Sequence, residues 1–550
     1  MKLTAIPQLA RNANRVREVL AVLSRYGLAD WISRLNLGLA KGIFRGSEGR
    51  LADLTTEARI RLALTDLGTT FIKFGQIMST RADLVGLPLA TELSKLQGNV
   101  PADPPTVVHA TILRELGRPV SEIFATFDDV PIASASIAQV HGATLLDGQA
   151  VVVKVQHPDI AARIRNDLDI LAGLAELADK YVEELRPYQP RAITAEFSRT
   201  LLRELDFCRE LRNLERFVKN FAEEKDVHFP MPVPHLSTSR ILVMERLYGV
   251  TFGEIQALDG TIEREVLAKR GARVVLEMLF RDGFFHADPH PGNLLVLTDG
   301  TTGVLDVGMV GQLTPSLKED MEDLLLALGQ QDAERLTATL IRLCGRGGIR
   351  EPAGFASDVA DFMGYYTGLP LDKINISGAL TEITDIIRRH HLMLPTDIAM
   401  LLRVLILLEG TARLLYPQFQ LMEMIQPFEE RMIADRFSPL RQFRHLRRVL
   451  KDWQDLVVRF PTQIRDLTQQ LETGRMEVQL QHHHLQTSVN RLVLAMITAA
   501  LLLGSSILWA QQAPPTIEGI SVLGVFGFII SATCAIGLIR AVLRSGNLDG

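Results

Sequence analysis

Cysteine is scarce in this sequence, and several other common signals are missing. The three cysteines, Cys208, Cys344 and Cys534, form no CxxC pair, which argues against a disulfide framework and indicates a reducing compartment or simple burial. A net charge of −5 supplies no basic field, so we expect no nucleic-acid partner. Arginines interrupt the N-terminal apolar residues, so no signal peptide is predicted. No dinucleotide fingerprint G-x-G-x-x-G precedes a helix.

The densest group of polar side chains lies in residues 286–295, His-Ala-Asp-Pro-His-Pro-Gly-Asn-Leu-Leu. Two prolines and a glycine exclude a regular helix, so a loop is predicted. On an extended segment His286, Asp288 and His290 would share one face, as ligands of non-haem iron do. Alternatively, Asp288 and Asn293 have the spacing of the base and the magnesium-binding amide in a phosphotransferase loop.

The residues that follow favour the phosphotransferase. The apolar run from Asn293 to Leu297, a turn at 298–300 and a second run at 302–305 predict a β-hairpin. This hairpin leads into Asp306-Val307-Gly308. A kinase needs a carboxylate there to hold magnesium under the nucleotide phosphates, whereas iron ligation does not.

A lysine at the end of a buried apolar run would be the third component of a phosphotransferase site. Residues 131–143 and 151–155 predict two strands, and the small residues at 133–136 would let backbone N–H groups approach phosphates. An ammonium at Lys154 is costly there unless it meets a phosphate or a carboxylate. A helix predicted from Glu196 to Val218 offers the carboxylate, and one of three acids should pair with the lysine: Glu204, Asp206 and Glu210.

Helical periodicity dominates the rest of the chain. Residues 10–45 predict an amphipathic helix pair, for which packing is favoured over a place on a membrane surface. In a later helix Lys73, Gln76 and Thr80 share one face, and this polar stripe implies a partner. Residues 315–475 are almost entirely helical by spacing.

Two uncharged apolar stretches, residues 492–510 and 520–539, lie near the C-terminus, and each is long enough to cross a bilayer. The loop between them lacks Lys and Arg, whereas Arg491, Arg540 and Arg544 flank their outer ends. The positive-inside rule therefore predicts a transmembrane hairpin with the rest of the chain in the cytoplasm. Burial in a soluble core is the alternative.

Between residues 10 and 430 these motifs resemble the UbiB/ADCK family of atypical kinase-like proteins. Lys73-Phe74-Gly75-Gln76 matches the family's KxGQ signature, residues 133–136 its alanine-rich loop, and Glu204-Leu205-Asp206 its ExD motif. Residues 288–293 and 306–308 match the catalytic and metal-binding loops. The terminal hairpin is similar to that of bacterial UbiB-like members, which are associated with ubiquinone biosynthesis.

The resemblance implies an α+β, two-lobed, protein-kinase-like fold with an N-terminal helical extension that covers the peptide groove and projects Lys73 into the site. The expected domains are an extension with the KxGQ motif (1–105), a nucleotide-binding small lobe (106–249), a helical large lobe (250–430), a helical linker (431–490) and two transmembrane helices (491–545).

The resemblance also implies a site for ATP or ADP and Mg²⁺. Asp288 would be the proton acceptor, with Lys154 and Lys73 as further catalytic residues. The magnesium ligands would be Asn293 and Asp306, with Glu204 and Asp206 as polar groups near the metal. The nucleotide-binding residues would be Ile132, Ala133, Ser134, Ala135, Ser136, Ala138, Lys154, Glu210 and Glu245.

We therefore expect a magnesium-dependent ATPase or atypical kinase that is anchored in the inner (cytoplasmic) membrane and supports ubiquinone (coenzyme Q) biosynthesis. Its expected partners are the bilayer, lipid intermediates and enzymes of the quinone pathway, and a second copy of the chain. A covered peptide groove suits ATP hydrolysis or a small lipid better than a protein substrate. The alternatives are a nucleotide-binding pseudokinase scaffold and an iron-dependent quinone hydroxylase.

Overall fold

The computed structural model has two compact units, Met1–Arg441 and Gln442–Gly550. The residues that it describes are 12–28, 54–96, 98, 100–257, 263–344, 351–367, 375–436, 485–511, 513–517 and 520–543.

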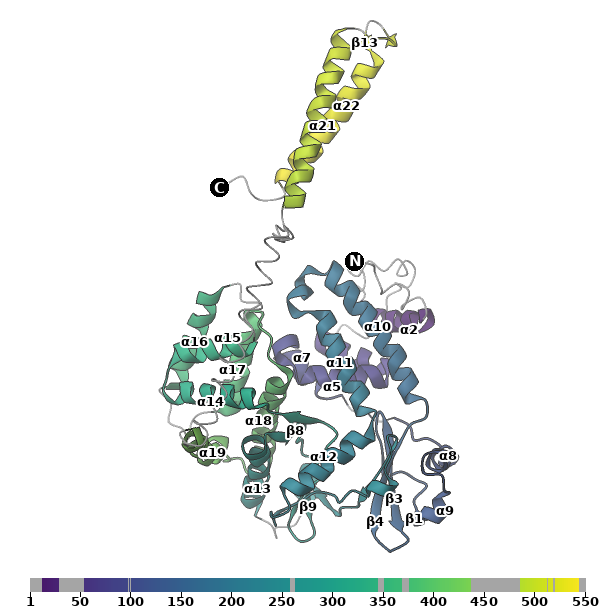
Figure 1. The fold of residues 1–550 in the computed structure, drawn as a ribbon, viewed down its shortest axis with the longest axis vertical. Coiled ribbons are helices and arrows are strands. Elements are labelled where there is room, and N and C mark those ends of the chain that lie inside the picture. The colour runs from purple at the N-terminus through teal and green to yellow at the C-terminus, as the bar shows by residue number, and fades with distance from the viewer. Residues whose placement is uncertain are drawn as a thin grey trace, which may run out of the picture. The chain divides into compact units, whose positions relative to one another are not determined.

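A five-stranded antiparallel sheet in the first unit carries Lys154 (Figure 1). Its strands are β1 (Phe124–Phe127), β2 (Ala133–Ser134), β3 (Ala138–Leu145), β4 (Ala150–Gln156) and β6 (Ile241–Glu245). The order is β1-β3-β4-β6, and β2 pairs with β3. Alternate valines of β4 are buried against α8 (Pro105–Leu116), so Lys154 points to the opposite face. Its neighbours in the ladder are Val140 and Leu242, which fix the lysine from both sides.

A second sheet contains the predicted hairpin. Its order is β5 (Val227–His228), β10 (Thr302–Val304), β9 (Leu294–Leu297) and β7 (Gly249–Thr251). The hairpin β9–β10 is confirmed, and Gly300 adopts a φ of 84° in its turn. Before and after the hairpin, β8 (Phe284–His286) pairs with β11 (Val310–Gln312), so both flanking segments lie side by side.

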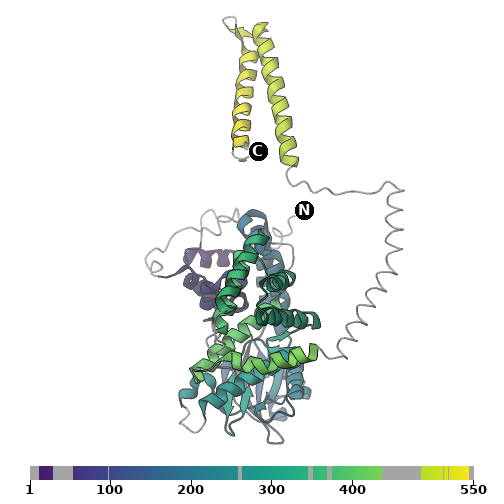
Figure 2. The ribbon, with the colours of Figure 1, turned by 90° about the vertical axis from the view of Figure 1, so that its left-hand side faces the viewer.

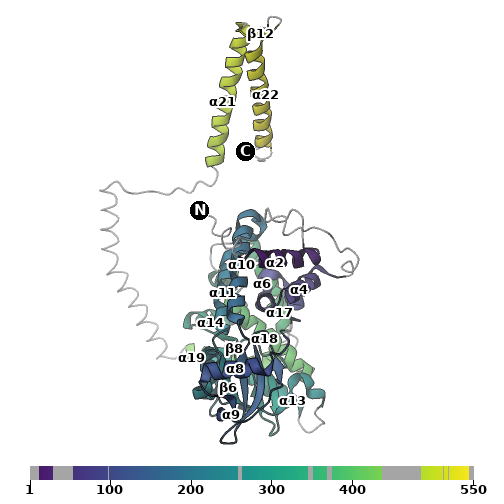
Figure 3. The same cartoon turned by 90° about the vertical axis from the view of Figure 1, so that its right-hand side faces the viewer.

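Helices of the N-terminal extension pack on the same unit. They are α2 (Ala13–Arg25), α4 (Thr56–Leu67), α5 (Thr69–Ser79), α6 (Ala82–Val85) and α7 (Leu87–Leu93). Val16 and Leu20 of α2 are buried against Ile170 of α10 (Ile160–Tyr181), beside which α2 lies in Figure 3. Packing is therefore confirmed for the first helix of the expected pair, and the second falls outside the described residues.

The single helix expected from Glu196 to Val218 is wrong. The structure has two helices there, α11 (Pro190–Glu204) and α12 (Phe207–Asn220). Asp206 lies between them in an extended conformation, and its carboxylate accepts a hydrogen bond of 3.1 Å from the N–H of Cys208. An aspartate that caps a helix N-terminus satisfies one of its free N–H groups, so the chain begins a new helix here.

The helical part of the first unit is built on two hydrophobic clusters. Its elements are α13 (Arg264–Leu276), η5 (Glu277–Asp282), α14 (Pro315–Gly329), α15 (Ala333–Cys344), α16 (Pro352–Thr367), α17 (Ile376–Arg389), α18 (Thr396–Leu415) and α19 (Leu421–Arg436). Phe285 and Val304, which flank the polar loop, are fully buried against α13 and α18. The loop is therefore attached to a rigid base. The helical residues expected from 437 to 475 lie outside the described ranges.

In the second unit α21 (Leu485–Ala510) and α22 (Val522–Leu543) lie side by side (Figure 2). A Cβ atom on Gly524 would come within 3.0 Å of the Trp509 backbone nitrogen, so glycine permits this close packing. Among the described residues one helix, over Val493–Ala510, is long and apolar enough to cross a membrane, and 6% of that stretch is buried. The apolar part of α22, Val522–Leu538, is shorter than the second span that the sequence predicts.

Candidate nucleotide and catalytic site

Lys154 of β4 forms an ion pair with Glu210 of α12. The lysine Nζ lies 2.9 Å from both carboxylate oxygens, and the two side chains are 19% and 9% exposed. Burial disfavours the ammonium, but the carboxylates of Glu210 and Asp306 outweigh this effect and raise the pKa of Lys154. Lys154 therefore stays charged, and of the three acids that the sequence offers as its partner, Glu210 forms the pair.

Asp306, directly after β10, lies beside this pair. Its Oδ1 accepts a hydrogen bond of 2.8 Å from the N–H of Gly308. A Cβ atom on Gly308 would lie 3.1 Å from Asp306 Oδ1 and 3.8 Å from Glu210 Oε2. Surrounding protein atoms disfavour the charge of Asp306, but the Lys154 ammonium and the Gly308 N–H outweigh them and lower its pKa to about 2. Asp306 is therefore ionised at neutral pH.

The polar loop brings Asp288 and Asn293 to the same region. The side-chain amide of Asn293 donates to the Asp288 carbonyl at 3.1 Å, and its backbone N–H donates to the His290 carbonyl at 2.9 Å. Leu305 donates from its backbone to the Asn293 carbonyl at 2.9 Å. This last bond holds Asn293 next to the residue that precedes Asp306.

Arg403 of α18 contacts the loop, although no sequence motif includes it. Its Nη2 lies 3.5 Å from Asp288 Oδ1, and its Nη1 donates to the Ser79 hydroxyl at 2.6 Å. Burial lowers the pKa of Arg403, and the Asp288 carboxylate opposes that effect. The signal in the sequence is weak but present: Arg403 is the lone charge in the apolar run Ile398–Leu408, and a charge there needs a partner.

Lys73, from the KxGQ segment on α5, pairs with Glu204 at the end of α11. The distance from Nζ to Oε2 is 2.9 Å, and the side chains are 20% and 10% exposed. Burial disfavours the ammonium, but Glu204 and then Asp306 outweigh it and raise the pKa of Lys73. Lys73 thus lies within the field of the same acids as Lys154.

The other two residues of the KxGQ motif have packing roles. Gln76 donates from its side-chain nitrogen to the Leu96 carbonyl at 3.0 Å. A Cβ atom on Gly75 would lie 2.2 Å from Leu96 Cδ1 and 3.0 Å from Leu64 Cδ1. The glycine therefore lets α5 approach its neighbours, and the glutamine holds the chain that leaves α7.

The alanine-rich loop contacts residues that sequence reasoning missed. His157 places Nε2 2.9 Å from the Ala135 carbonyl and Nδ1 2.6 Å from Asp103 Oδ2. A Cβ atom on Gly98 would lie 3.0 Å from Ser136 Cβ, so the extension also touches the loop. Both contacts join segments far apart in sequence, which no local pattern reveals.

Glu245 and Asp206 have other contacts. Glu245 Oε2 lies 2.9 Å from His228 Nε2 and accepts a hydrogen bond of 3.0 Å from the Met231 N–H. Asp206 caps α12 and lies 3.8 Å from Arg209. Roles for these two residues in binding the cofactor stay predictions.

The geometry does not favour the iron alternative. His286 is buried, and burial lowers its pKa; its Nδ1 faces the Met309 carbonyl at 3.3 Å. His290 is exposed instead, and its Nδ1 accepts a hydrogen bond of 2.9 Å from the Gly292 N–H. Within the described residues no group of three or more His, Cys, Asp or Glu side chains could hold a metal ion by itself.

The oxygen atoms at the site do fit magnesium held together with a nucleotide. Asp306 is ionised, and Asn293 directs its amide nitrogen to Asp288, which leaves its Oδ1 available. Glu204 Oε1 is buried and has no hydrogen-bond partner in the described part of the chain. Magnesium binds hard oxygen ligands and is usually held by one or two carboxylates together with substrate phosphates.

Three family models match the chain: the ABC1 atypical kinase-like domain over residues 95–340, the UbiB helical domain over 359–420 and the ABC1/UbiB kinase-like C-terminal domain over 478–544. The fold that carries the site is therefore kinase-like. A solved structure, the Rv3197–erythromycin complex from Mycobacterium tuberculosis, matches with a TM-score of 0.43 and 22% identity over 64% of this chain and 90% of that chain.

Curated relatives match over nearly the whole length. A protein of Clostridium pasteurianum named "Uncharacterized protein in hydrogenase 1 5'region" is 32% identical over 97% of this chain and 99% of its own. "Probable protein kinase UbiB" of Azotobacter vinelandii is 34% identical over 94% of this chain and 95% of its own. "Probable protein kinase UbiB" of Pseudomonas aeruginosa is 33% identical over 84% and 86%. The chain therefore belongs to the UbiB/ADCK family of atypical kinase-like proteins.

Proposed function

We propose that this protein is a membrane-anchored, magnesium-dependent ATPase or atypical kinase that supports ubiquinone biosynthesis. One observation carries the proposal: Lys154, Glu210 and Asp306, from three separate elements, meet around one point. A cation and two acids in that arrangement suit a nucleotide phosphate with its metal. The name of the curated relatives, UbiB, supports the link to ubiquinone.

In this proposal each residue has a defined role. Lys154 binds a phosphate, and Glu210 orients the lysine. Asn293 and Asp306 would hold the metal, which would neutralise phosphate charge. Asp288 accepts a proton from the attacking hydroxyl or water, and Arg403 positions its carboxylate.

The acceptor is more consistent with water or a small lipid than with a protein. Lys73 reaches the acids of the site from the extension, and Ser79 at the end of the same helix contacts Arg403. These contacts bring α5 close to the proposed base, which supports an acceptor smaller than an extended peptide. The apolar helix Val493–Ala510 supports a membrane anchor. The arginines at the outer ends of the two apolar stretches support a cytoplasmic body. Quinone-pathway lipids and enzymes, and a second copy of the chain, are the proposed partners.

Phosphate release by the purified full-length protein in liposomes tests the enzymatic proposal. Asp288→Asn should lower Mg-ATP turnover by about 100-fold or more, because the amide cannot accept the proton, and should lower the melting temperature only slightly, through loss of the ion pair with Arg403. Asp299→Asn, in the exposed hairpin turn, is the matched control and should retain turnover. Full turnover in Asp288→Asn would refute the role of Asp288.

One observation favours a second function, a pseudokinase scaffold. Asp288 and Glu204 are already paired with Arg403 and Lys73, so the two acids are neutralised by the protein itself. A scaffold should be stabilised by Mg-nucleotide against thermal unfolding. It should release no phosphate at any lipid composition, which separates it from the enzyme.

A further inference from the structure

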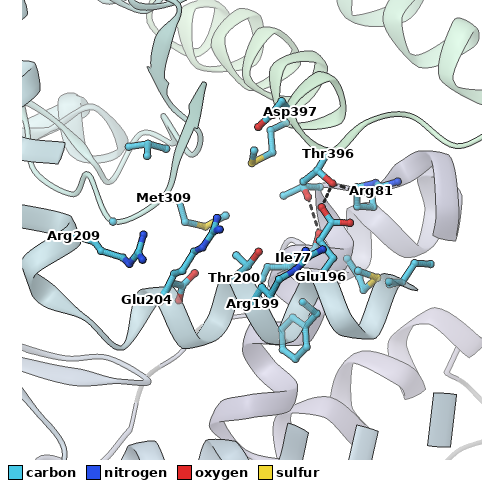
Figure 4. A pocket seen from close by; sticks show the side chains of 18 of the residues that line it. Ile77, Arg81, Glu196, Arg199, Thr200, Glu204, Arg209, Met309, Thr396 and Asp397 are labelled. Carbon is cyan, nitrogen blue, oxygen red and sulfur yellow. Dashed lines mark hydrogen bonds between the residues drawn. The ribbon is translucent and has the colours of Figure 1, made fainter. Parts of the chain in front are cut away.

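A cavity of about 450 Å³ lies in the first unit, outside the pair Lys154–Glu210. Its walls are α5, α11, the start of α12, the start of α18 and the segment 308–310 that follows Asp306 (Figure 4). A cavity of this size lies within the range of small-molecule sites.

The two ends of the cavity differ. At one end lie Glu204, Arg209 and Met309 (Figure 4). The other end is closed by a polar cluster in which Arg81 donates to the Thr396 hydroxyl at 3.4 Å and that hydroxyl donates to Glu196. The polar groups of this cluster already form hydrogen bonds with one another. A ligand must therefore find its polar partners along α11 and at the Glu204 end.

Two arginines there have no partner in the described part of the chain. Arg199 and Arg203 stand one turn apart on α11 and line the cavity, and both are exposed. Neither has an ion pair or hydrogen bond within the described residues, whereas Arg209 lies 3.8 Å from Asp206. Two adjacent guanidinium groups with free N–H donors match the oxygen atoms of a phosphate or carboxylate.

The remaining wall combines apolar side chains with the polar side chains of Thr80, Thr200, Asn213 and Asp397. Ile77 comes from α5, Phe197 from α11, Met309 from the segment after Asp306, and Met400 from α18. Methionines adapt to ligands of irregular shape. A ligand that contacts both the two arginines and the apolar side chains therefore has an anionic group and a small apolar body.

We propose that this cavity binds a small amphiphilic anion, with its anionic group on Arg199 and Arg203 and its apolar body against Ile77, Met309 and Met400. Lys154 and Asp288 do not line the cavity, so the ligand is distinct from the nucleotide. Glu204 does line it and is the partner of Lys73. Binding therefore changes the environment of the Lys73–Glu204 pair and modulates ATP turnover, a consequence that rests on the proposed function.

Binding of phenyl phosphate to the full-length protein in detergent micelles, with saturating Mg-ADP present, tests the site by calorimetry. The wild type should bind phenyl phosphate about tenfold more tightly than the Arg199→Gln/Arg203→Gln variant, since each charged contact contributes to anion affinity. Arg191→Gln, on the same helix but outside the cavity, should bind like the wild type. Melting temperatures check that all variants are folded.

If the wild type and the double variant bind phenyl phosphate with equal affinity, the proposed binding site is wrong. Equal affinity for inorganic phosphate and phenyl phosphate would overturn its amphiphilic character. Displacement of phenyl phosphate by vesicles that contain phosphatidic acid would identify a lipid phosphate as the source, and displacement only by soluble phosphate esters would identify a metabolite. Because binding is measured without turnover, an inactive wild type would refute the ATPase proposal and leave the site standing.

Discussion

The guanidinium of Arg403 joins the proposed catalytic base to the N-terminal extension: it lies 3.5 Å from Asp288 Oδ1 and 2.6 Å from the Ser79 hydroxyl. Arg403 and Asp288 are 18% and 32% exposed, so the charges are only partly screened by solvent. The carboxylate therefore has a fixed position relative to α5. Any movement of that helix must either break the Ser79 contact or move the base.

Removal of this arginine should impair chemistry more than nucleotide binding. Arg403→Met leaves Asp288 without its partner, and we expect turnover to fall by about tenfold, or 1.4 kcal/mol, with little change in nucleotide affinity. Ser79→Ala keeps the ion pair and should have a smaller effect. Initial rates over a range of ATP concentrations separate the two parameters. Arg389→Met, which removes an exposed surface ion pair with Asp358, is the control.

The Lys154–Glu210 pair permits a double-mutant cycle. Lys154→Met leaves the Glu210 carboxylate buried without its cation, and Glu210→Gln removes the nearest anion from Lys154. We expect each single variant to lose about 3 kcal/mol of stability. The double variant should recover most of that loss, because no buried charge of the pair is left alone. Urea unfolding measures these changes.

Nucleotide binding should follow a different pattern in the same cycle. If Lys154 contacts a phosphate, Lys154→Met and the double variant should both bind a fluorescent ATP analogue about tenfold more weakly or worse. The double variant would then be stable yet defective. A double variant that binds nucleotide like the wild type would contradict the role of Lys154.

Several features of the site were predictable because local chemistry determines them. The hairpin β9–β10 has an Asp299-Gly300 turn between two apolar runs, and the glycine takes the positive φ that the turn requires. A buried ammonium at Lys154, at the end of a valine run, is costly without an anion, and the carboxylate of Glu210 is that anion. In both cases the residues that decide the outcome lie within a few positions of each other or carry a charge that must be neutralised.

Other features depend on distant segments and could not be predicted. The chain breaks at Asp206 because its carboxylate caps α12, yet the helical periodicity of the residues on both sides indicated one continuous helix. Arg403 and His157 act on Asp288 and Ala135 across the fold, and only the assembled structure brings them together. Ile520 and Ser521, at the start of the second apolar stretch, form a short strand, β13, before α22 begins, and the second membrane span stays a prediction.

Acid should weaken the contribution of Asp306 to the stability of the folded protein. Its folded pKa of about 2 lies below the unfolded value of about 3.9. The stabilisation is therefore fully present above pH 4 and is lost as the pH falls toward 2. Because Asp306 is exposed, solvent screening reduces this contribution to about 1 kcal/mol. Asp306→Asn should lower the melting temperature at pH 6, and the difference from the wild type should shrink steadily below pH 4 and vanish only once the pH has fallen through about 2. Asp147→Asn, in an exposed turn, is the control.

Gly75 should control how closely α5 packs on its neighbours. In Gly75→Ala the new Cβ atom would come within 2.2 Å of Leu96 Cδ1, so the buried leucine must move. We expect a loss of about 1–2 kcal/mol from overpacking, although alanine favours the helix. Gly364→Ala, in α16 with no atom within 4 Å of its Cβ, should be neutral or stabilising. Thermal unfolding of both variants tests the difference, and equal stabilisation by the two alanines would show that the KxGQ glycine is not required for packing.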